Sequence, residues 1–154
     1  MKRFAVMLAA SALFPAALFG APRSDYLDIV ESAVDAHTPE RRAAYIGRVE
    51  KEGITEHGFA RLTANLGTLV SNGRRGDLRD EFVRMMDLCA REQPVAEKRN
   101  GAMRGGHSAV GSEFAVKELV FAVVEAERSG LFPKGKTDAW RAAFTPMAAA
   151  EIYS

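Results

Sequence analysis

Apolar side chains recur every three to four residues through most of this chain, and that spacing restricts what it can fold into. The clearest stretch holds Phe59, Leu62, Leu66, Leu69 and Val70. Steps of three and four place such residues on one side of an α-helix. No stretch shows the sustained two-residue alternation, rich in β-branched residues, that marks a half-buried strand. The sequence therefore predicts an all-α fold.

Capping and stop residues divide the chain into six expected helices. Thr38 offers a capping hydroxyl before Pro39, which suits a first helical position, and Gly53, Gly73 and Gly130 are typical helix ends. Short connections make consecutive helices antiparallel neighbours, so we expect stacked helical hairpins or a bundle. The expected helices run over 24–37, 39–53, 55–71, 77–94, 112–130 and 137–146.

The expected fifth helix contains an almost continuous apolar run, Leu119–Val124. A helix that is apolar on nearly all sides is normally buried on nearly all sides. We therefore expect it to be the most buried element of the fold. Glu118 and Glu125 bound the run, so it is not a membrane span.

The first twenty residues have the order of a secretory signal peptide. Lys2 and Arg3 precede an apolar run over residues 4–19, and Gly20 offers a small residue for cleavage. This pattern predicts export to the periplasm or the extracellular space, with no membrane span after cleavage. An uncleaved membrane anchor and cleavage after Ala21 are the alternatives.

Residues 21–154 form one expected domain with a modest core. Without Lys2 and Arg3 the chain carries 19 basic and 20 acidic residues, a net charge of −1. A near-neutral balance provides no electrostatic footprint for nucleic acid. Cys89 is the single cysteine, which we expect to be a small buried core residue rather than a nucleophile or an intermolecular bridge.

The segment 94–111 is the candidate functional region because it combines glycines with basic and amide side chains. Arg99 and Arg104 can bind carboxylates or sulfates, Asn100 can hydrogen-bond a ligand, and His107 is the candidate for proton transfer. Long irregular segments in compact domains are often binding loops. A solvated connector with an exposed histidine is the alternative interpretation.

Other chemistry finds little support in the sequence. There is no HExxH motif, no Cys/His cluster, no glycine-rich motif after a strand and no P-loop, so we expect neither a metal nor a cofactor. Trp140 can stack on a sugar, but its place in the expected sixth helix favours docking on the core. Tyr45 fits the apolar stripe of the second helix better than a catalytic role.

One family resemblance is carried by the C-terminal part of the chain. The stretches Gly111–Glu125, Gly130–Lys134 and Thr137–Arg141 resemble the helical N-terminal region of secreted heparinase II/III-like polysaccharide lyases, over roughly residues 60–154. The resemblance implies an incomplete α/α toroid acting on acidic polysaccharides by β-elimination. It is a helix-and-linker pattern, and no catalytic motif of the family matches. Six helices are also fewer than a toroid needs.

Two functions therefore stay open after the sequence is read. The first is the N-terminal part of a longer, polysaccharide lyase-like protein, in which Arg99, Arg104 and His107 contact an acidic polysaccharide. The second is a non-catalytic exported helical module that binds a partner. The sequence predicts no oligomeric state.

Overall fold

The computed structural model describes residues 24–101 and 112–152, and within these ranges all regular structure is helical. This confirms the predicted all-α class. The predicted signal peptide, residues 1–20, lies outside the described residues. The elements are α1 (Ser24–Asp35), α2 (Pro39–Glu52), α3 (Gly58–Ser71), the 3-10 turn η2 (Gly76–Leu78), α4 (Arg79–Gly101), α5 (Ser112–Ser129) and α6 (Lys134–Ile152).

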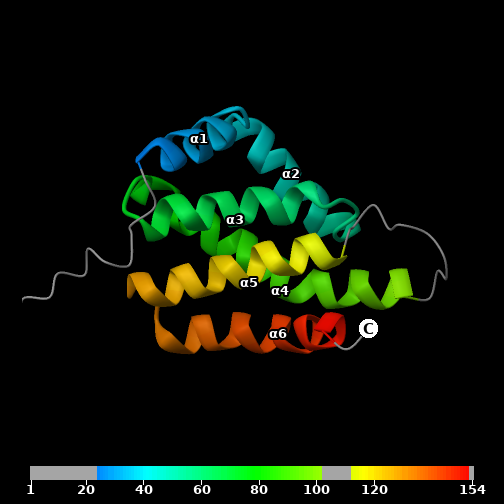
Figure 1. Ribbon diagram of the computed structural model, residues 1–154. Coiled ribbons are helices and arrows are strands. Elements are labelled where there is room, and N and C mark those ends of the chain that lie inside the picture. The colour runs from blue at the N-terminus through cyan, green and yellow to red at the C-terminus, as the bar shows by residue number, and fades with distance from the viewer. Residues whose placement is uncertain (1–23, 102–111, 153–154) are drawn as a thin grey trace, which may run out of the picture.

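The helices pack in layers around α3 (Figure 1). α1 and α2 lie over one side of α3, α5 runs along its other side, and α6 returns antiparallel to α5 as a helical hairpin. α4 passes behind and contacts α2, α3, α5 and α6. The arrangement agrees with stacked helices, whereas an incomplete α/α toroid stays a prediction from the family resemblance.

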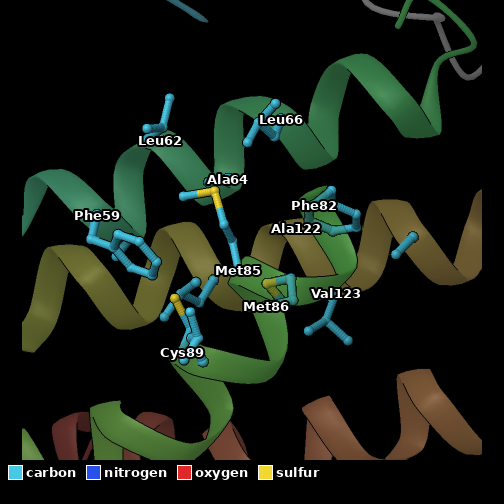
Figure 2. Packing of buried hydrophobic residues seen from close by; sticks show 14 of the residues in the cluster. Phe59, Leu62, Ala64, Leu66, Phe82, Met85, Met86, Cys89, Ala122 and Val123 are labelled. Atoms are coloured by element: carbon cyan, nitrogen blue, oxygen red, sulfur yellow. The ribbon is translucent and has the colours of Figure 1, made fainter. Parts of the chain in front are cut away.

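α3 is the most buried element, because it contacts α1, α4 and α5. Ten of its 14 residues are buried. The expectation that α5 would be most buried is wrong: Phe121, in the middle of its apolar run, is 52% exposed. Figure 2 shows Phe59 of α3 and Met85 and Met86 of α4 gathered where these helices meet α5.

The predicted core roles of Cys89 and Trp140 are confirmed. Cys89 is fully buried, and burial raises the pKa of its thiol to about 12. Trp140 is also buried and packs edge-on against Phe82 and Phe132 at centroid distances of 5.7 and 5.8 Å. Its indole N–H donates to Asp87 Oδ1 at 2.8 Å, so it docks α6 onto α4.

Two proline stops predicted from the sequence are wrong. α4 continues through Pro94 to Gly101, and α6 continues through Pro146 to Ile152. Proline removes one backbone hydrogen bond from a helix. In α4 the helix stays packed beyond Pro94, because Ala96 is buried in the hydrophobic core. The segment 94–101 is therefore helical and not part of an irregular loop.

Three predicted helix starts also move. α3 begins at Gly58 rather than after Thr55, and α4 begins at Arg79, after η2, rather than at Asp77. α6 begins at Lys134, and the hydroxyl of Thr137 donates back to the Lys134 carbonyl at 3.0 Å instead of capping the helix.

None of the described helices is long and apolar enough to cross a membrane.

Candidate functional site

A groove rich in polar side chains, with a volume of about 710 Å³, lies open between α1, α2 and α3. We call it the arginine groove. Three arginines, one histidine and one carboxylate line it, together with a tyrosine, an asparagine and small or apolar residues. The lining residues are Ala33, His37, Arg41, Ala44, Tyr45, Arg48, Glu56, Gly58, Arg61, Leu62 and Asn65.

One face of α2 supplies the wall of the arginine groove. Arg41, Tyr45 and Arg48 follow one another at steps of four and three, which places them on the same side of a helix. Arg48 follows Arg41 by seven positions, so their Cα atoms lie about 10.5 Å apart along the axis. Arg41 lies in the first turn of α2, at the positive end of the helix dipole.

Tyr45 lies between the two arginines on this face, and its neighbours hold its ring in place. Its ring packs edge-on against Phe59 with centroids 5.1 Å apart, and the Arg48 guanidinium lies over it at 4.8 Å. The Tyr45 hydroxyl lies beside Gly58, where an added Cβ would come within 3.1 Å of it. Tyr45 is thus half core residue, as predicted, and half groove residue.

Glu56 interacts with both Arg48 and Tyr45 of this face. Arg48 Nη2 donates to Glu56 Oε1 at 3.0 Å, and the same carboxylate is close enough to Tyr45 to raise its pKa. Burial, with Glu56 adding to it, raises the pKa of Tyr45 well above its usual value. The phenol therefore stays protonated and is suited to donating a hydrogen bond rather than to removing a proton.

Arg41 is the cation that stays open to a ligand. Its guanidinium makes no ion pair or hydrogen bond with any residue that the structure describes, and its side chain is exposed. Arg48 is committed to Glu56, and Arg61 donates to Glu118 Oε1 at 3.2 Å. The arginine groove therefore offers one uncommitted guanidinium flanked by two others that are 51% and 60% exposed.

The α1–α2 connection, which carries His37, is fixed by the neighbouring Arg42. This side chain points away from the groove, is only 4% exposed and donates to Glu81 Oε1 at 2.5 Å. Arg42 also donates to the His37 carbonyl at 2.6 Å. The buried Arg42, between α2 and α4, thus fixes the backbone at His37, one of the residues that line the groove.

A second polar cluster lies beside Arg61 at the start of α3. His57 Nε2 is 3.0 Å from Glu118 Oε2, and Glu118 also accepts from Arg61. The sequence neighbours Glu56 and His57 therefore reach different partners. This cluster ties α3 to α5. The Glu118 carboxylate pairs with Arg61, as the Glu56 carboxylate pairs with Arg48.

None of the four predicted site residues has a side chain among those that the structure describes. Arg104 and His107 lie outside the described residues. Arg99 and Asn100 belong to the last turn of α4, where the structure describes no side chains. Whether these four residues form a site stays a prediction.

Sequence reasoning missed the arginine groove because each arginine, taken alone, looks like part of a solvated helix face. The available signal was the spacing of Arg41, Tyr45 and Arg48, which is cationic and aromatic on one face. Glu56 and Arg61 come from elsewhere in the chain, and no local pattern places them opposite α2.

Within residues 24–101 and 112–152, no group of three or more His, Cys, Asp or Glu side chains is arranged to hold a metal ion. Comparisons with protein-family models, with curated proteins and with solved structures gave no match. The fold and the site together define a helical protein with a basic surface groove, and this groove is the starting point for a functional proposal.

Proposed function

We propose that this chain is an exported helical module that binds an acidic polysaccharide in the arginine groove. The observation that carries the proposal is the uncommitted guanidinium of Arg41 beside two further arginines. Without the leader the whole chain has a net charge of −1, whereas the lining of this groove holds three arginines and one glutamate. Guanidinium groups bind carboxylates and sulfates through paired hydrogen bonds.

The shape of the arginine groove favours an extended polymer over a small anion. Arg41 and Arg48, which both line it, are separated by about 10.5 Å along α2. A polymer with anions at regular intervals can bind Arg41 and at the same time compete with Glu56 for Arg48, whereas a single carboxylate reaches only one of the two arginines. The Tyr45 hydroxyl, Glu56 and Asn65 add groups that can hydrogen-bond sugar hydroxyls.

Binding without catalysis is the better supported of the two functions that the sequence left open. A β-elimination needs a base that removes a proton from the sugar ring. Tyr45, which lies between Arg41 and Arg48 on one face of α2, has a pKa that burial and Glu56 raise. The lyase function would therefore need another base, either His37, which also lines the groove, or His107, which lies outside the described residues.

The test is a calorimetric titration with alginate and heparin oligosaccharides, and with a neutral dextran oligosaccharide of equal length. We expect the acidic ligands alone to bind. Arg41→Ala should weaken binding about tenfold or more, because a hydrogen bond to a charged group contributes about 1.5–3 kcal/mol.

Arg91→Ala is the matched control, because Arg91 is exposed on α4 and pairs with its neighbour Glu92 at 2.6 Å. It removes the same charge at a distance from the arginine groove and should leave the affinity nearly unchanged. Equal losses in the two variants, or no binding of acidic ligands, would contradict the proposal. Release of unsaturated sugars during the titration would establish the lyase function instead.

A further inference from the structure

Phe121 is an anomaly within the most apolar part of the chain. It lies in the middle of α5 and is 52% exposed, while its neighbours Ala122 and Val123 are buried. Beside it on α5, Val120 and Val124 line an adjoining apolar groove of about 260 Å³ that reaches Phe144 of α6; Phe121 lies at the edge of this groove rather than in its lining. Contiguous apolar surface on a folded domain marks a contact site more often than isolated exposed residues do.

The charges on either side of Phe121 specify what this face can contact. Lys117 precedes Phe121 by four residues and Glu125 follows it by four, so all three lie along one face of α5. The Glu125 carboxylate accepts a hydrogen bond from Thr68 Oγ1 at 2.6 Å, which fixes its place at the edge of this face. The face therefore has a cation at one end, an aromatic ring in the centre and a carboxylate at the other end.

Such a face is complementary to itself. A two-fold axis through Phe121 runs a second α5 antiparallel to the first and places the two phenyl rings against each other. The same operation sets Lys117 opposite Glu125 of the second copy, twice. Two-fold interfaces are the commonest in homo-oligomers, and opposite charges fix their register.

The other exposed large apolar residues on described helices, Tyr26, Ile29 and Val95, do not have this property. Tyr26 of α1 has Pro22 and Val30 four residues away on either side, and neither is charged. Ile29 of α1, at 68% exposure, has Asp25 and Ala33 four residues away on either side. Val95 of α4 has an arginine four residues before it and another four residues after it, so the same two-fold operation would place like charges opposite each other.

We infer that this protein forms a homodimer through α5, with Phe121 on the two-fold axis and Lys117 of each copy paired with Glu125 of the other. The dimer covers Phe121 and the adjoining Val120 and Val124. The arginine groove lies between α1, α2 and α3, and each copy keeps its own.

The first test measures molar mass by light scattering over a dilution series of the purified chain. We expect twice the mass of one chain at high concentration. Phe121→Glu should raise the dissociation constant at least tenfold, because it puts two like charges on the axis. Ile29→Glu, a matched change at a more exposed site, should leave the dimer intact.

A monomeric wild type, or a dimer that survives Phe121→Glu, would overturn the inference. Loss of the dimer in both variants would overturn it as well. Far-ultraviolet circular dichroism of each variant verifies that it is folded, so that a change in mass reports the interface.

Cross-linking tests the register independently. Phe121→Cys places two thiols on the axis, and mild oxidation should convert most of the chain to a covalent dimer. Val95→Cys is the matched control and should not cross-link. The buried Cys89 cannot contribute to either product while the chain is folded. A dimer by mass that Phe121→Cys does not cross-link would refute the proposed axis.

Discussion

At the scale of single residues, Gly67 sets how closely the central helices approach. It lies in α3, and a Cβ added to it would fall 2.8 Å from Phe82 Cε2 and 3.3 Å from the Ala122 Cβ. A contact below 3 Å is tighter than real side chains tolerate, so α3 meets α4 and α5 at this point only because the side chain is absent. The close packing around α3 depends on one missing methyl group.

Gly67→Ala should therefore destabilise the fold although alanine is the better helix former. Overpacking a well-filled core costs about 1–3 kcal/mol, which exceeds the gain of about 0.5–1 kcal/mol from removing a helical glycine. The change in the free energy of unfolding is measured by urea denaturation, followed by far-ultraviolet circular dichroism.

Gly47→Ala is the control for this prediction. Gly47 is exposed in α2, and nothing lies within 4 Å of an added Cβ. The same substitution should there stabilise the protein by about 0.5–1 kcal/mol. If both variants gain stability, the helices around Gly67 are less tightly packed than described.

At the scale of elements, two arginine–glutamate pairs join the same two helices in different environments. Arg42 of α2 pairs with Glu81 of α4 and is 4% exposed, whereas Arg84 of α4 pairs with Glu50 of α2 and is 58% exposed. Because both pairs join α2 to α4, a comparison of the two shows how burial changes the contribution of an ion pair to the stability of the fold.

Arg42→Ala should cost about 3 kcal/mol in the free energy of unfolding, because it strands Glu81 and leaves the His37 carbonyl without its donor. Arg84→Ala should cost less than about 1 kcal/mol, since exposed ion pairs contribute little. The free energy of unfolding of each variant is to be measured by urea denaturation at moderate salt. Similar costs for the two variants would show that Arg42 is more accessible to water than described.

The ends of the helices show how far the sequence could predict the fold. Gly53, Gly73 and Gly130 follow helices as expected and have positive φ angles of 77°, 73° and 66°, a conformation that glycine adopts without strain. Pro94 and Pro146 were expected to end helices and did not. A glycine stop depends on the local backbone, whereas the cost of a proline is one that packing of the rest of the helix can offset.

The candidate site was less predictable than the fold for a related reason. Helical periodicity identified the core residues Cys89 and Trp140, because burial on one helix face is a local pattern. The arginine groove depends on Glu56 and Arg61 standing opposite α2, and that juxtaposition depends on how three helices pack. Only the Arg41–Tyr45–Arg48 spacing carried information about it within one helix.

At the scale of the whole molecule, the question is whether the α5–α6 hairpin unfolds together with the rest. α5 packs along α3, and α6 packs on both α4 and α5. Trp140 anchors α6 to Phe82 and Asp87 of α4. The core thus continues from α1 through α6 without a break in contacts, and we expect one cooperative transition.

Trp140 provides a direct measurement, because it is the only tryptophan in the chain. Its fluorescence reports the docking of α6 on α4, while far-ultraviolet circular dichroism reports all helices together. The two urea transitions should coincide in midpoint and slope, as two-state unfolding requires. Gly67→Ala should move both midpoints down equally, since it loosens the contact of α3 with α4 and α5 on which α6 depends. A fluorescence transition that precedes the loss of helix would show instead that α6 is a separate unit, held to the core by little more than Trp140.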